Sequence, residues 1–199
     1  MDDTAWLLQG LLAFVWAPLL VAAGVLDWAL HRAQRIELSS GLAESALHLA
    51  MLVLVGSAIL AALLLQPTAG LLAVLIAVVL LHDLSYLADL RVALAKRRIP
   101  VLEQWVHGFQ HLLPWAGLSC LLALAPAQTL ALLHWPGHTA AADWALRFKA
   151  DPPWTYTGVL LAVSLLLNVL PFCEEAWRSA RVAQRQRGTR RPNRPTTSA

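Results

Sequence analysis

The sequence is poor in charged residues and in cysteine. Asp, Glu, Lys and Arg make up only 14% of its 199 residues, and 58% are hydrophobic, whereas an ordinary soluble domain carries roughly 25% charged residues. The two cysteines, Cys120 and Cys173, each lie inside an apolar stretch. We therefore expect no disulfide between them and exclude a secreted disulfide scaffold. Water is a poor solvent for such a chain, which indicates a membrane protein.

The apolar stretches show no alternation of polar and apolar residues, which excludes a transmembrane β-barrel. Five windows rich in Leu and Ala are long enough for helices that cross about 30 Å of hydrocarbon. They cover residues 5–30, 42–65, 70–90, 103–125 and 156–176. Because a helix satisfies its own backbone hydrogen bonds in lipid, the sequence predicts an all-α polytopic bundle of about five transmembrane helices within residues 1–178.

Basic residues gather at one end of the predicted spans. Thirteen of the fifteen Lys and Arg residues lie in 32–35, 91–98 and 178–194, and only Arg147 and Lys149 lie on the other side. Cytoplasmic loops are enriched in such residues. We therefore expect a membrane protein with its N-terminus outside and its C-terminus in the cytoplasm. No basic patch suggests binding to nucleic acid, and membrane lipids are the expected partners.

Two segments outside the spans have their own predictions. Residues 179–199 are basic and poor in apolar side chains toward the end, so we expect a disordered cytoplasmic tail close to anionic lipid headgroups. On the outer side, the stretch from Asp143 to Lys149 mixes aromatic and charged residues. That mixture predicts a short helix lying in the membrane interface.

Ionisable residues inside spans are costly and mark functional sites, and here they fall in the cytoplasmic half of their spans. Carboxylate and imidazole groups recur four residues apart, a spacing that places both on one helix face. The three pairs are Asp27 with His31, Glu44 with His48, and Glu103 with His107. On the third span His82, Tyr86 and Asp89 form one stripe, and His111 lies one turn beyond His107.

Imidazole and carboxylate groups are ligands of iron, zinc and manganese, and di-iron carboxylate proteins hold their ions with such residues in a bundle core. The sequence therefore predicts a divalent metal centre, with iron, as a pair of ions, favoured over zinc or manganese. The candidate ligands are Asp27, His31, Glu44, His48, His82, Asp89, Glu103, His107 and His111. Tyr86 is the candidate catalytic residue, as a hydrogen-bond donor or in electron transfer.

Each residue also has a simpler explanation. An acid at position 44 or 103 would be favoured in a first helical turn by the helix dipole, and the pair at 27 and 31 would suit the headgroup boundary. Glu174 and Glu175 are expected to be solvated at the interface. Arg97 and its basic neighbours are first of all topology signals. Three parallel pairs favour the metal interpretation over these separate explanations.

The box from Arg98 to His107, Arg-Ile-Pro-Val-Leu-Glu-Gln-Trp-Val-His, occurs with Asp27-Trp-Ala-Leu-His31 and with the segment from Gly41 to His48. Together these motifs resemble an uncharacterised family of bacterial multi-spanning membrane proteins over most of residues 20–178, and this resemblance implies a location in the bacterial inner (plasma) membrane. Some relatives of this type carry a diguanylate-cyclase label, but the Gly-Gly-Asp/Glu-Glu-Phe signature is absent here, so we exclude that activity. The similarity to integral-membrane di-iron hydroxylases and desaturases is loose, because the His-x-x-His-His box is also absent.

Two functions of different classes stay open. One is a membrane-embedded, metal-dependent oxidoreductase, with a di-iron centre as its favoured form, whose lipid-like or quinone-like substrate enters laterally. Its electron donor is not indicated. The other is a non-catalytic metal carrier or accessory subunit, in which the metal only joins the helices. Axial ligation of a haem by His48 and His107 is a third alternative, and the many nearby carboxylates disfavour it.

Overall fold

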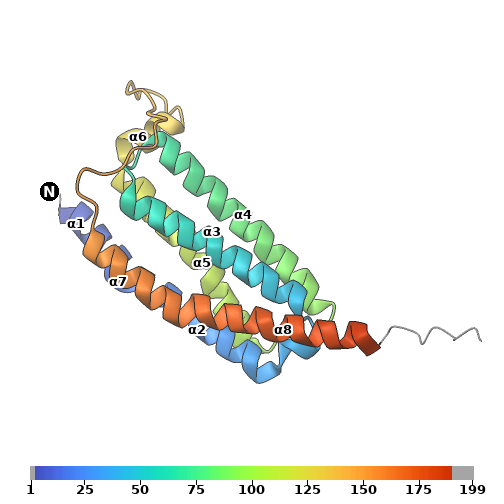
Figure 1. Cartoon of the computed structure of the whole chain (residues 1–199). Coiled ribbons are helices and arrows are strands. Elements are labelled where there is room, and N and C mark those ends of the chain that lie inside the picture. The colour runs from blue at the N-terminus through green and yellow to red at the C-terminus, as the bar shows by residue number, and fades with distance from the viewer. Residues whose placement is uncertain (1–2, 190–199) are drawn as a thin grey trace, which may run out of the picture.

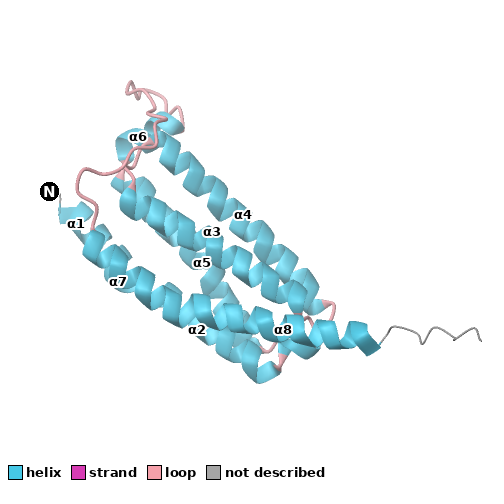
Figure 2. Cartoon of the chain, in the orientation of Figure 1, coloured by secondary structure: helices cyan, strands magenta, loops and turns pink. Residues whose placement is uncertain are grey.

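The computed structural model describes residues 3–189, and they form the expected all-helical bundle (Figure 2). Four helical segments are long and apolar enough to cross a membrane, namely Asp3–Gln34, Leu42–Leu64, Ala69–Leu94 and Trp154–Arg187. Val101–Leu124 with Pro126–Leu132 makes a fifth if this pair, bent by 104°, is one span. The prediction of about five membrane helices is confirmed.

The elements follow each other as a chain of helices (Figure 1). They are α1 (Asp3–Leu11), η1 (Leu12–Trp16), α2 (Ala17–Gln34), η2 (Ile36–Leu38), α3 (Leu42–Leu64), α4 (Ala69–Leu94), α5 (Val101–Leu124), α6 (Pro126–Leu132), α7 (Trp154–Ser164), η3 (Leu165–Val169) and α8 (Leu170–Thr189). The connections α2–α3 and α4–α5 lie at the end of the bundle crossed by α8. We call it the basic end, since Arg32, Arg97 and Arg178 lie there.

Two of the long segments contain a π-helical turn just before a proline. The turn η1 precedes Pro18, and the turn η3 precedes Pro171. A proline lacks an N–H group and its ring clashes with the carbonyl four residues earlier, so the helix widens there. When the amide of Asn168 is oriented so that its nitrogen faces acceptors, it donates to the freed carbonyl of Leu167 and to the carbonyl of Val21, each at 3.2 Å. Both long segments therefore continue through their prolines.

The two halves of the bundle are packed differently. Toward the far end, Leu71, Leu75, Val79 and Leu118 form an apolar core between α4 and α5. Toward the basic end, the buried side chains are mostly carboxylates and imidazoles. Large apolar side chains on the outer surface of the spans are exposed, as they would be against lipid tails. The polar interior and apolar exterior reverse the arrangement of a soluble protein.

The predicted interfacial helix from Asp143 to Lys149 is wrong, because this stretch forms no helix. Its backbone pairs with the α3–α4 turn: the amide of Gln66 donates to the carbonyl of Arg147 at 2.8 Å, and the amide of Lys149 donates to that of Leu64 at 2.9 Å. The second bond gives a partner to the carbonyl of Leu64, which lies in the last turn of α3 and has no acceptor role within the helix. The outer segment is thus fastened across the far end of the bundle.

The last helix continues beyond the expected domain boundary at residue 178. Ser179 is buried and its hydroxyl lies 3.0 Å from that of Ser45 on α3, and α8 reaches Thr189. The rest of the predicted disordered tail, residues 190–199, lies outside the described residues. Neither Cys120 nor Cys173 forms a disulfide, as predicted.

Candidate metal centre

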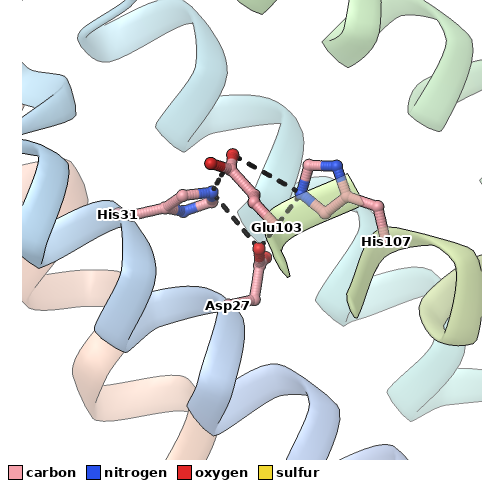
Figure 3. Close-up of side chains that lie close together, drawn as sticks. All are labelled: Asp27, His31, Glu103 and His107. Carbon is pink, nitrogen blue, oxygen red and sulfur yellow. Dashed lines mark hydrogen bonds and ion pairs between the residues drawn. The ribbon is translucent and has the colours of Figure 1, made fainter. Parts of the chain in front are cut away.

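Carboxylates and imidazoles from several helices meet inside the basic end of the bundle (Figure 3). The four-residue spacing turns each predicted pair inward on one face of its helix. We call the whole set the polar cluster; it consists of Asp27, His31, Glu44, His48, Asp89, Arg97, Glu103, His107 and Glu175. Its carboxylates and imidazoles are at most 4% exposed. The headgroup-boundary explanation for the pair on α2 is therefore wrong.

Four ligand atoms in the polar cluster point toward one another (Figure 3). The Nε2 atom of His31 lies 3.2 Å from Oδ1 of Asp27 and 3.2 Å from Oε1 of Glu103. The Nε2 atom of His107 lies 3.0 Å and 3.9 Å from the same two oxygens. Bonds of 2.0–2.2 Å to a tetrahedral ion place ligand atoms about 3.3 Å apart. We call this set the four-residue group, and its geometry suits a metal ion.

A second set consists of His31, Glu44 and His48, whose ligand atoms lie within 4.8 Å of one another. Beside it, Oδ1 of Asp89 lies 3.3 Å from Nε2 of His48. Both carboxylate oxygens of Asp89 are buried without a hydrogen bond to any described residue, and such groups call for a cation or a proton. His31 belongs to both sets, but only one of its ring nitrogens is free for a metal, so it can serve one ion. The four-residue group offers four ligand atoms and is therefore the better-defined metal position.

Glu175 orients two of the imidazoles. Its Oε2 lies 3.1 Å from Nδ1 of His31, and its Oε1 lies 3.1 Å from Nδ1 of His48. The two rings are stacked, with centroids 4.5 Å apart. If both Nδ1 atoms donate to Glu175, both Nε2 atoms present lone pairs to the cluster. Carboxylate–imidazole pairs of this kind support metal ligands in many proteins.

The expectation that Glu175 is solvated is wrong, since its exposed fraction is 0%. Its neighbour Glu174 does behave as expected: it is partly exposed and pairs with Arg32 at 2.7 Å. The sequence contained one signal that Glu175 is buried, namely a polar stripe on the last span. Asn168, Glu175 and Ser179 are spaced by seven and four residues, which places them on one helix face, and all three are buried.

Arg97 lies in the α4–α5 connection and its guanidinium reaches into the polar cluster. Its role is therefore more than that of a positive charge that sets the topology. Its guanidinium donates to Glu44 at 3.3 Å, to Glu103 at 3.0 Å and to the side chain of Gln34 at 2.9 Å. Burial alone would lower the pKa of Arg97, but the bonds to Glu103 and Glu44 outweigh it and raise the pKa above its usual value. The two acids are thus paired in the interior, and a first-turn dipole effect does not explain them alone.

The charges of the polar cluster do not balance without further cations or protons. It contains five carboxylates and one guanidinium, and three imidazoles that are neutral when they bind a metal. With neutral imidazoles the buried excess is four negative charges, which two divalent ions would cancel. Protonation of all three imidazoles would still leave one negative charge. Uncompensated buried charge is very costly, so the donor set fits bound cations.

His82 and His111 lie outside both sets of ligand atoms. Nδ1 of His111 is 3.1 Å from Oδ1 of Asp83, and Nδ1 of His82 is 3.8 Å from the same oxygen. Seven residues separate His82 from Asp89, so it lies about 10 Å farther along α4 from the basic end. Tyr86 stands between, with its ring centroid 6.0 Å from that of His107 and 5.4 Å from that of His111.

A cavity of about 810 Å³ adjoins the polar cluster, within the range of about 300–1,000 Å³ for small-molecule sites. Asp27, His48, Tyr86 and Gln110 line it at the cluster, and apolar residues of α2, α3, α7 and η3 line the rest. We call it the lateral cavity. Its rim includes Val53 on α3 and residues 161 and 165 opposite, all exposed, so it opens between α3 and the last span.

Comparisons with protein-family models, curated proteins and solved structures give no match. The resemblance drawn from the motifs therefore stays an expectation.

Proposed function

We propose that this protein is a membrane-embedded, metal-dependent oxidoreductase that acts on a lipid-like or quinone-like substrate. The basic end would face the cytoplasm of a bacterium, with the bundle in the inner membrane. The resident metal would be divalent, with iron preferred to zinc or manganese. The observation that carries the proposal is the position of four buried ligand atoms beside an apolar cavity that opens sideways.

The four-residue group would hold one ion, and Glu44 and His48 would hold a second in a di-iron form. When bound, such an ion supplies electron transfer and Lewis acidity that side chains lack. The protein's own groups position the donors. Glu175 fixes two imidazoles, and the side-chain amide of Gln110 donates to Oδ2 of Asp27 at 3.2 Å, which leaves its Oδ1 directed at the group.

The lateral cavity would hold the substrate and exclude water. Its apolar walls favour a hydrocarbon part, and its few polar groups at the cluster would orient a polar end. Tyr86 lines the cavity and contacts His107 edge-on, so its phenol would lie between substrate and metal. That position suits a hydrogen-bond donor or an electron-transfer residue, and it suits no role in holding the metal.

The second candidate function is a non-catalytic metal protein, and one feature favours it. Four protein donors complete a tetrahedral shell, as in structural zinc sites, which keep no open position. An ion that prefers six ligands would leave two positions in the same group for substrate or oxygen. The identity of the bound metal therefore separates the two functions.

The test replaces His107 and His48 singly with Ala and measures metal per protein after expression in medium replete in iron and zinc. His134→Ala is the control, because this histidine is exposed at the far end. We expect His107→Ala to lose most of the metal and the control to keep it. Iron with an optical spectrum that responds to reductant supports the oxidoreductase. Redox-silent zinc supports the structural alternative, and no metal in the wild-type protein refutes both.

A further inference from the structure

We infer that the bundle contains a continuous tunnel for one long hydrocarbon tail, which runs from the polar cluster to the far end. The inference rests on the proposed lipid-like substrate and adds its shape and its orientation. It depends on the cavities and on the depth of the cluster, and not on the presence of a metal.

A second cavity lies in the far half of the bundle and has a volume of about 700 Å³. We call it the outer lumen. It is lined by residues of α1, η1, α3, α4, α5 and α7 and of the segment before α7, and its lining is predominantly apolar. The outer lumen and the lateral cavity share lining residues from four helices, namely Ala17, Val55, Ile59, His82 and Leu160. The two cavities therefore adjoin each other along these five shared residues, as the two parts of one tunnel would.

The length of this path suits a long tail. Helix α3 borders it from His48 at the cluster to Ala62 at the far end. These residues are fourteen positions apart, which corresponds to about 21 Å of helix rise. One leaflet of the hydrocarbon core is about 15 Å thick. A tail that starts at the cluster and fills both cavities would therefore extend past the midplane of the bilayer.

The polar groups lie at the two ends of the path. Asp27, Tyr86 and Gln110 line the end at the cluster, and Gln9 and Lys149 line the opposite end. The ammonium of Lys149 is half-buried and donates to the carbonyl of Ala62 at 2.8 Å. Asp151 also lines the far end. Between the two ends the lining is predominantly apolar, with His82 at the junction and with Ser57, Thr157, Ser164 and Asn168 among its polar side chains. This distribution matches a molecule with one polar end and one long apolar tail.

A small polar end group is required, because the cluster is buried. His48 lies six residues into α3, about 9 Å from its first residue, and is 4% exposed. The charged headgroup of a two-tailed phospholipid would have to leave the interface and lose its hydration to reach that depth. A fatty acid and an isoprenoid quinone both have a small end group and a single tail. Their shared chemistry defines the ligand, and the experiment distinguishes them.

The π-helical turns support the same path. Residues 12, 13, 14 and 16 of η1 line the outer lumen, and residues 165, 168 and 169 of η3 line the lateral cavity. Such turns often occur at functional sites, because they displace side chains from the regular helical positions. Each cavity is thus bordered by a turn that a proline fixes in place.

The experiment measures binding of single-tailed probes to the purified full-length protein in detergent, by native mass spectrometry. The probes are stearic acid, decanoic acid and menaquinone, with phosphatidylglycerol as the two-tailed comparison. Gly56→Trp fills the lateral cavity, where an added Cβ meets nothing within 4 Å. Ala58→Phe fills the outer lumen alone. Gly158→Trp is the matched control, since this exposed glycine lines neither cavity and also has open space.

We expect Gly56→Trp to weaken every single-tailed probe at least tenfold, and Ala58→Phe to weaken stearic acid or menaquinone but not decanoic acid. Gly158→Trp should bind like the wild type. The probe that binds more tightly identifies the source of the ligand. The inference is overturned if no single-tailed probe binds, if phosphatidylglycerol binds equally well, or if the control loses as much as Gly56→Trp.

The failure of this inference differs from failure of the proposed function. Both cavity variants should keep the wild-type metal content, because neither residue touches the four-residue group. His107→Ala should lose metal and still bind the tail. Metal binding without tail binding would support the proposed metal centre and refute the tunnel. Tail binding without metal would support the tunnel and refute the metal centre.

Discussion

Replacement of Glu175 by Gln should weaken metal binding at the polar cluster without removing any residue of the four-residue group. The substitution keeps the size of the side chain and changes only its hydrogen bonding. In the native protein the carboxylate accepts from Nδ1 of two imidazoles, each at 3.1 Å. A carboxylate can accept both bonds, whereas an amide has one acceptor and one donor.

The amide must therefore donate to one of the two rings. That ring, His31 or His48, must then carry its proton on Nε2 when it is neutral, and a protonated nitrogen cannot bind a metal. Loss of such an outer partner lowers metal affinity by about 10- to 100-fold in other proteins, which equals about 1.4–2.7 kcal/mol. We expect a loss within that range, with the upper part reached if His31 is the affected ring.

Competition with a chromophoric chelator measures the affinity, and elemental analysis measures the bound metal. Glu174→Gln is the matched control, because the neighbouring carboxylate pairs with Arg32 at the surface and does not contact the imidazoles. Wild-type affinity in Glu175→Gln would contradict the orienting role. An equal loss in Glu174→Gln would indicate a general effect of charge at this end of α8.

Three further predictions concern stability and topology. Arg97→Gln should destabilise the protein by about 3–5 kcal/mol, since it leaves two buried carboxylates unpaired, while exposed Arg98→Gln should leave the melting temperature unchanged. Gly24→Ala should cost about 1–3 kcal/mol through overpacking, because the added Cβ would lie 2.5 Å from the buried side-chain amide of Asn168, whereas the added Cβ of Gly158→Ala meets nothing within 4 Å. Equal melting temperatures would contradict the tight contact. Cysteines placed at Arg98 and His138 of a cysteine-free variant should react with impermeant reagents from opposite sides of the membrane, with Arg98 on the cytoplasmic side, and labelling of both from one side would refute the topology.

The helices were predictable because lipid imposes a simple rule on the sequence. A span must be apolar over about 20 residues, and the five windows found in this way all lie within long helical segments. The ends were less predictable, since polar residues extend a helix beyond the apolar window. Helix α2 continues to Gln34, and His31 and Gln34 in its last turn contact Glu103 on α5. Helix α8 continues past Ser179, whose hydroxyl contacts that of Ser45 on α3.

The polar cluster was only partly predictable. Four-residue spacing reveals which side chains share a helix face, so the three acid–imidazole pairs could be found. How far each helix is rotated and shifted against its neighbours is decided by packing, which no short pattern contains. His82 was expected among the metal ligands but lies toward Asp83 instead. Glu175 and Arg97 were missed as members because each looked like an ordinary interfacial charge, and only the fold brings them inside.

The order in which the polar cluster is synthesised has a consequence for insertion into the membrane. Asp27, His31 and Glu44 lie on the first two spans, whereas Arg97 and Glu175 follow much later in the chain. During translation the early spans must enter the membrane before these later partners exist, and ionisable groups within a span are costly when they lack partners. The last span then supplies the carboxylate that joins two imidazoles already in place. Assembly of the bundle is therefore complete only when α8 arrives, and a ribosome stalled before it would hold an unfinished protein, suited to recognition by membrane quality control.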